Sequence, residues 1–129
     1  MKVVIRADAT PTIGIGHFTR CMTLARELQA ADHSVEFQSH CEIPYLIKTA
    51  ANNGIQIVRL NSENETKNSP LIQSDQQCDW AVLDGYHFDE AAQIAAQKSA
   101  DKLLVIDDTP RDINYSADLI LDQNYGAES

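Results

Sequence analysis

Short apolar segments rich in β-branched residues alternate along the chain with segments whose apolar residues recur at helical spacing. Continuous or alternating apolar runs predict strands, whereas apolar positions three or four residues apart predict the buried face of a helix. Six strands are expected on this basis, over residues 3–7, 35–39, 55–60, 80–84, 103–107 and 118–122. Three helices are expected, from about residue 17 to 31, over 44–52 and over 89–99, and the polar stretch 61–77 predicts a loop.

Strands separated by helices are typical of βαβ units, whose parallel strands form a sheet with helices on both faces. The chain therefore predicts an α/β fold, a Rossmann-like parallel sheet of about six strands, and its 129 residues suit one such domain. Ligands of such sheets bind beyond the carboxyl ends of the strands. The residues to inspect for function are therefore those that follow the strands, at 8–20, 39–40, 84–87, 107–108 and 122–124.

The charge balance is acidic, with 10 basic and 19 acidic side chains and a formal net charge of −9 at pH 7. Nucleic-acid binding depends on neutralising phosphates, so a nucleic-acid partner is not expected. Residues 61–129 contain four basic and fourteen acidic side chains, whereas residues 1–60 contain six basic and five acidic side chains. A small anionic ligand is therefore expected to prefer the first half of the chain.

No apolar run approaches the ~18 residues of a membrane span, and the first strand is too short and too soon followed by charge to be a signal peptide. Cys21, Cys41 and Cys78 are odd in number, lack CxxC spacing and form no zinc pattern with the four histidines. They are expected to be reduced, buried thiols of a cytoplasmic protein. Neither a metal nor a cofactor is predicted.

The sharpest local motif is Gly-Ile-Gly-His at residues 14–17, which joins the first strand to the first helix. Two glycines allow the backbone to pass close to a ligand, and a helix start presents N–H groups to an anion. A dinucleotide fingerprint would need glycine at Thr19 and an acidic residue in place of Ser39-His40, so the motif does not predict NAD binding.

His17 is expected in the first turn of that helix, where the helix dipole disfavours the imidazolium and leaves a neutral ring able to accept a proton. Arg20 lies three residues later on the same helix face and could hold a phosphate oxygen. A base beside an anion clamp suits hydrolysis or transfer at a phosphorylated substrate. The alternative is that His17 caps the helix and Arg20 pairs with a local carboxylate.

Two further groups follow later strands. Tyr86, in the segment 84–87, could orient a leaving oxygen or a water, or could be an aromatic residue of an ordinary turn. Asp107 and Asp108 could bind a metal or share a proton, but a turn before Pro110 accounts for them equally well. We therefore interpret this pair as mainly structural.

Six blocks of the sequence together resemble the N-terminal part of the nucleotide-sugar hydrolase family of pseudaminic acid biosynthesis and the related spore-coat polysaccharide biosynthesis proteins. They are IRAD at 5–8, IGIGH at 13–17, RCMTLA at 20–25, DWAVLDGY at 79–86, IDD at 106–108 and LILDQN at 119–124. The glycine-histidine loop is also similar to that of MurG-type glycosyltransferases.

The resemblance implies a GT-B architecture, in which two Rossmann-like domains enclose the active site and residues 1–129 form the N-terminal one. It implies cleavage of UDP from a UDP-2,4-diacetamido-2,4,6-trideoxyhexose by attack of water at the anomeric carbon, with inversion. His17 resembles the residue proposed to activate that water, and Tyr86 matches a tyrosine after the fourth strand. Other residues would bind the substrate or shape its pocket: Arg6, Asp8, Gly14, Gly16, Arg20, Asp84 and Asn124.

The chain departs from the family pattern by ending at Ser129, before the second domain, which in the family supplies most contacts to uridine and diphosphate. A C-terminal GT-B domain in the same polypeptide or in a separate chain is therefore an expected partner, without which little turnover is expected. Two alternatives stay open: half of a MurG-like glycosyltransferase, and a non-catalytic subunit that pairs with a nucleotide-binding chain.

Overall fold

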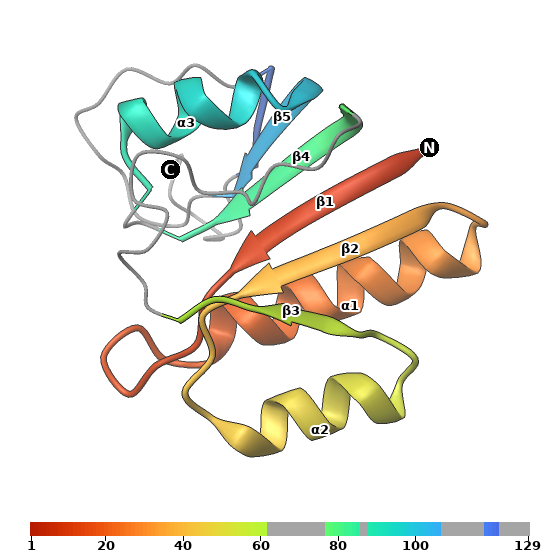
Figure 1. Cartoon of the computed structure of the whole chain (residues 1–129), viewed down its shortest axis with the longest axis vertical. Helices are drawn as coiled ribbons and strands as arrows, with labels where there is room; N and C mark the ends of the chain where they lie inside the picture. The colour runs from red at the N-terminus through yellow and green to blue at the C-terminus, as the bar shows by residue number, and fades with distance from the viewer. Residues whose placement is uncertain (62–76, 86–87, 107–117, 122–129) are drawn as a thin grey trace, which may run out of the picture.

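A computed structural model of the chain describes residues 1–61, 77–85, 88–106 and 118–121 (Figure 1). These ranges contain β1 (Lys2–Ala7), α1 (Gly16–Ala30), β2 (Ser34–Ser39), α2 (Pro44–Asn52), β3 (Ile57–Arg59), β4 (Cys78–Asp84), α3 (Glu90–Gln97), β5 (Ala100–Ile106) and β6 (Leu119–Leu121). Every helix and strand expected from the sequence is present in this part of the chain, whereas the loop expected over 61–77 lies outside it except for its first and last residues.

The strands form one sheet in the order β3-β2-β1-β4-β5-β6, and every pair of neighbours is parallel. The chain begins in the middle with β1, proceeds outward through β2 to β3, and then resumes at β4 on the other side of β1. The direction of strand addition therefore reverses between β1 and β4. This confirms the predicted α/β fold, a Rossmann-like parallel sheet of six strands.

Helices cover the sheet on both faces, as Figure 1 shows. The helices α1 and α2 lie on one face, over β1, β2 and β3, whereas α3 lies on the opposite face, over β4 and β5. Parallel crossovers are right-handed, so helices change face where the direction of strand addition reverses. Of the helices in the described part of the chain, none has the length and hydrophobicity that spanning a lipid bilayer requires.

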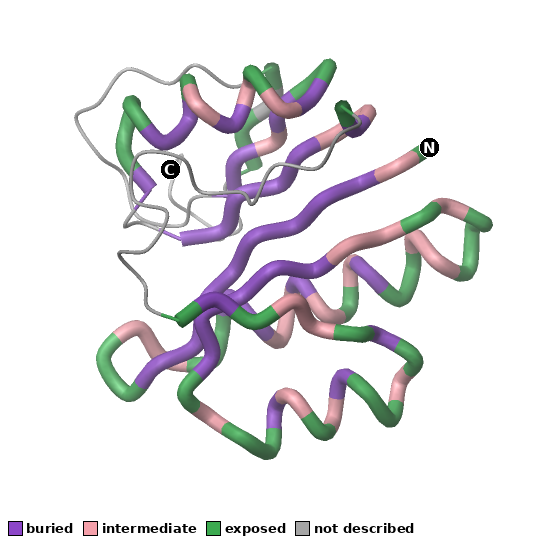
Figure 2. The backbone as a smooth tube through the Cα atoms, viewed as in Figure 1, coloured by how far each residue is buried: buried purple, intermediate pink, exposed green. Residues whose placement is uncertain are grey.

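Two apolar clusters pack against the sheet, one beneath α1 and α2 and the other beneath α3. In the first, the rings of Phe18 from α1 and Phe37 from β2 lie with centroids 5.0 Å apart. The strand β1 contributes to both, because Val3 and Ile5 face α1 whereas Val4 belongs to the cluster under α3. Figure 2 shows β1 buried along most of its length, and its burial on both faces of the sheet explains why it is an almost continuous apolar run.

Some element boundaries differ from the sequence prediction. The helix α2 spans the predicted residues, with Pro44 in its first turn and Gly54 at φ +78° after its end. By contrast, α3 ends at Gln97 and β5 begins at Ala100, three residues earlier than expected. Ala100 pairs with Cys78, so the two strands lengthen each other where neither segment has a strong apolar pattern of its own.

Replacing Phe18 with alanine should remove a ring that has no exposed surface and leave a cavity between α1 and β2. We expect the free energy of unfolding in urea to fall by about 3–5 kcal/mol. Tyr45→Ala is the control, because that ring is 58% exposed on α2, and its cost should be below about 1 kcal/mol. Equal losses in the two variants would contradict the placement of Phe18 in the core.

Candidate functional site

The candidate site lies at the carboxyl edge of the sheet, at the point where the strand order reverses. In the register of β1 with β4, Ala7 is the partner of Asp84, so both strands end side by side. The loop after β1 leads into the first turn of α1, where His17 is the second residue of the helix. The predicted position of His17 is thus confirmed, and it lies where ligands of open parallel sheets bind.

The loop between β1 and α1 is closed by short hydrogen bonds around Thr10. The backbone N–H of Gly14 donates to the Thr10 carbonyl at 2.7 Å, and the N–H of Ile13 donates to Thr10 Oγ1 at 3.0 Å. Gly14 has φ +86°, a left-handed conformation that glycine adopts without strain. Gly16 begins α1, and a Cβ atom there would meet no atom within 4 Å. Gly14 therefore allows the left-handed backbone of the turn, whereas the absence of a side chain at Gly16 leaves open space at the helix start.

A hydrogen-bonded cluster joins α1 to the end of β4. His17 Nδ1 lies 2.7 Å from Asp84 Oδ1, and Arg20 binds the same carboxylate through both of its oxygens, Nη2 to Oδ1 and Nε to Oδ2. Because His17 and Arg20 converge on one oxygen, His17 Nδ1 and Arg20 Nη2 are only 3.0 Å apart. The structure thus contains one part of the alternative, the pairing of Arg20 with a carboxylate, although Asp84 is distant in sequence; it does not contain the other part, because His17 does not cap α1.

Asp84 is the centre of this cluster, and its side chain has no exposed surface. Burial by itself raises the pKa of the Asp84 carboxyl, but hydrogen bonds from Arg20 and His17 and their charges outweigh burial and hold the pKa below its ordinary value. Arg20 is the only one of the three with an appreciably exposed side chain, at 22%. The carboxylate is thus ionised at neutral pH and is not available for direct contact with a ligand.

Cys21 is a member of this cluster that the sequence reasoning missed. Its Sγ lies 3.4 Å from Asp84 Oδ2 and is buried. Burial, followed by the nearby Asp84 carboxylate, raises the pKa of the Cys21 thiol well above its ordinary value. The thiol is therefore a weak donor rather than a nucleophile. Its position four residues after His17, on the same helix face, is the signal that could have indicated it.

A second charged cluster lies at the same edge but on the face covered by α3. Arg6 binds both carboxylate oxygens of Asp8 at 2.8 Å, and neither side chain is exposed. Arg6 also lies over the ring of Phe88, 5.2 Å from its centroid, and Phe88 belongs to the apolar cluster under α3. Asp8 Oδ1 accepts a 2.9 Å hydrogen bond from the backbone N–H of His40. This pair therefore links the ends of β1 and β2.

The structure divides the predicted site residues into these two groups. His17, Arg20 and Asp84 are together, beside Gly14 and Gly16, whereas the Arg6–Asp8 pair is buried on the opposite face. Asp8 holds the backbone at His40, so this pair can shape a pocket at the same edge through the backbone that it fixes. Tyr86 and Asn124, as well as Asp107 and Asp108, lie outside the described residues.

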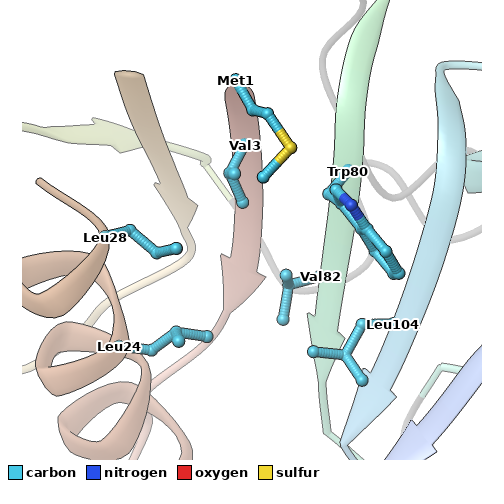
Figure 3. A pocket seen from close by; sticks show the side chains of 7 residues that line it. All are labelled: Met1, Val3, Leu24, Leu28, Trp80, Val82 and Leu104. Carbon is cyan, nitrogen blue, oxygen red and sulfur yellow. The ribbon is translucent and has the colours of Figure 1, made fainter. Parts of the chain in front are cut away.

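A cavity of about 210 Å³ is lined by no residue of either cluster, and Figure 3 shows the side chains that surround it. Its lining is apolar and comes from the N-terminal residue and from α1, β1, β4 and β5, namely Met1, Val3, Leu24, Leu28, Trp80, Val82 and Leu104. It contains no group that could do chemistry. In the residues that the structure describes, histidine, cysteine and carboxylate side chains nowhere gather in a group of three or more that could hold a metal ion.

No family model, curated protein sequence or solved structure matches the chain. A functional assignment therefore depends on the fold, on the two charged clusters at the carboxyl edge, and on the sequence blocks described above.

Alanine at the two glycines should have opposite effects on stability. Gly14→Ala places a side chain at φ +86° and should lower the free energy of unfolding by roughly 1–2 kcal/mol. Gly16→Ala meets no atom at the helix start and should be neutral or stabilising by up to about 1 kcal/mol. Urea denaturation of both variants measures the difference, and a destabilised Gly16→Ala variant would contradict the open space at that position.

Because the pKa of Asp84 is lowered in the folded protein, the free energy of unfolding should decrease at acidic pH. The folded-state pKa lies below that of the unfolded chain, about 3.9. The stabilisation is therefore complete above the unfolded value and is lost as the pH falls through the folded value. We expect the urea midpoint to fall from pH 7 to pH 3 by less in Asp84→Asn than in the unaltered protein. Equal falls would show that Asp84 ionisation is not linked to folding.

Proposed function

We propose that the chain is the base-bearing domain of a nucleotide-sugar hydrolase that releases UDP from a UDP-2,4-diacetamido-2,4,6-trideoxyhexose. The pathway would be the synthesis of nonulosonic acid or surface polysaccharide. His17 is the proposed general base. The observation that carries the proposal is the location of His17 in the first turn of α1, at the reversal of strand order, with Nδ1 bonded to the Asp84 carboxylate.

Three features support a role for His17 in proton transfer. Its side chain is 9% exposed, so the ring is held among protein groups and a small part of the side chain is open to solvent. The carboxylate of Asp84 holds one ring nitrogen, and an imidazole oriented in this way is a common form of general base. No side chain caps the start of α1 and its first turn has no acidic residue, so within the described residues the helix start favours an anionic substrate.

In the proposed reaction, Nε2 of His17 accepts a proton from a water molecule while the water oxygen attacks the anomeric carbon. The bond between that carbon and the β-phosphate oxygen breaks, and UDP leaves with the electron pair. The products are UDP and the free sugar with inverted anomeric configuration, and the imidazolium returns its proton to solvent. Open space beside Gly16 would admit the substrate close to the helix start.

The remaining roles rest on the resemblance. Tyr86 would orient the leaving oxygen or the water, and Asn124 would contact the substrate. A second domain, in the same polypeptide or in a separate chain, would hold the uridine and diphosphate. Positioning supplies much of the rate of such a reaction, so this domain alone is expected to turn over little substrate.

The test is release of UDP from the UDP-linked sugar, measured with this chain alone and with a UDP-binding GT-B domain added. We expect turnover only in the combined sample, and loss of about 10²–10⁴-fold in His17→Phe, since general-base catalysis contributes that much. In ¹⁸O-labelled water the label should enter the sugar and not UDP, because water attacks carbon rather than phosphorus.

His33→Phe is the matched control, because His33 follows α1 at its far end and its Nδ1 contacts the N-terminal amine at 3.2 Å. Unchanged turnover in His17→Phe would remove His17 from the mechanism. Absence of hydrolysis, with the second domain shown to bind both UDP and this chain, would refute the hydrolase assignment. Transfer of the sugar to an added acceptor would then identify a glycosyltransferase.

A further inference from the structure

We infer that Asp84 is a positioning residue, which holds His17 in the tautomer with the proton on Nδ1 and thereby makes Nε2 the basic nitrogen, while Arg20 holds Asp84 in place. The catalytic meaning of this inference rests on the proposed function, but the tautomer itself does not. The family resemblance implies that Asp84 and Arg20 bind the substrate or shape its pocket. Their contacts with His17 and with each other favour a positioning role.

The tautomer follows from the two neighbours of His17 Nδ1. A carboxylate oxygen lies 2.7 Å from it, and an ionised carboxylate can only accept hydrogen bonds. A lone pair on Nδ1 would face the lone pairs of that oxygen, whereas a proton there makes a charge-assisted hydrogen bond. Arg20 Nη2 also lies 3.0 Å from Nδ1 and carries two N–H groups, one of which donates to the same Asp84 oxygen. The contact of Nδ1 with the carboxylate is shorter and charge-assisted, so it is the contact that sets the position of the proton. Nδ1 therefore donates to Asp84, and the lone pair of the neutral ring is on Nε2.

Arg20 is what allows a fully buried carboxylate to perform this task. Its guanidinium binds both oxygens of Asp84, which fixes the rotation of the carboxylate as well as its ionisation. The Cys21 thiol donates to Oδ2 beside Arg20 Nε. These partners come from successive positions of α1, so the helix that presents His17 also locks the residue that orients it. Binding of Asp84 therefore uses Nε and Nη2 of Arg20.

Asp84→Asn tests the requirement for a carboxylate. The amide has nearly the same shape, but one of its two polar ends is an NH₂ donor, so it no longer prevents a lone pair on Nδ1. We expect the Nε2–H tautomer to become populated, and hydrolysis by the combined domains to fall by up to about 10⁴-fold, the effect that a wrong imidazole tautomer has in a serine-protease triad.

The measurement is a long-range ¹H–¹⁵N correlation spectrum of the full chain with ¹⁵N-labelled histidine, recorded from pH 6 to pH 9. The His17 signals are assigned by their loss in His17→Phe. In the unaltered protein we expect one tautomer, with the proton on Nδ1. Asp79→Asn is the matched control, because it makes the same change on β4 at a carboxylate that accepts from the backbone N–H of Lys2, and it should leave the His17 signals unchanged.

Two results would overturn the inference: an Nε2–H tautomer in the unaltered protein, or an unchanged Nδ1–H tautomer in a folded Asp84→Asn variant. The spectrum of the unaltered protein decides the first point even if Asp84→Asn does not fold. The inference and the proposed function can fail separately. The expected tautomer without UDP release refutes the reaction alone, whereas UDP release by a protein with the opposite tautomer refutes the role of Asp84 alone.

Discussion

Burial of an ionised carboxylate at the end of β4 is tolerable only if donors surround it, and Asp84 has no exposed surface. Its donors are His17, Arg20 and Cys21, all from the first two turns of α1. Because these three residues must all reach Asp84, their contacts fix the orientation of α1 about its axis and its position along the sheet. The same contacts place His17 at the carboxyl edge of the sheet. The hydrogen bonds that stabilise the ionised carboxylate are therefore also the ones that position the candidate base. Loss of one partner of such a buried pair typically costs about 3–5 kcal/mol.

The Arg6–Asp8 pair performs a related task on the opposite face of the sheet. It holds the chain just after β1, and the hydrogen bond from the His40 backbone to Asp8 ties that segment to the end of β2. The loop that carries Gly14 and Gly16 therefore starts from a fixed point and ends at a helix that Asp84 fixes. This arrangement is suited to a site that must be rigid before a ligand binds, since positioning depends on supports that do not move.

The proposed chemistry follows from what each group can and cannot do. Asp84 is buried and ionised, so it orients rather than titrates near neutral pH. Cys21 is a buried thiol whose pKa is raised, so it donates rather than attacks. Asp84 holds Nδ1 of His17, and the second ring nitrogen, Nε2, is the proposed base. A base in this position, at the uncapped start of a helix, suits a reaction that removes a proton from water near an anionic leaving group.

The sequence by itself determined the order and type of the elements, because apolar periodicity is a local property. It also placed His17 in the first turn of α1 from the glycines before it and the apolar spacing after it. The early start of β5 could not be predicted, because Ala100 becomes a strand residue through its pairing with Cys78 and not through its own preference. Only the tertiary structure decided which charges meet. Arg6 and Asp8 are two residues apart and pair with each other, whereas Asp84 lies 67 residues after His17 and reaches it because β4 lies beside β1. Hydrogen bonding depends on distance in space, and the order of strands in the sheet sets that distance.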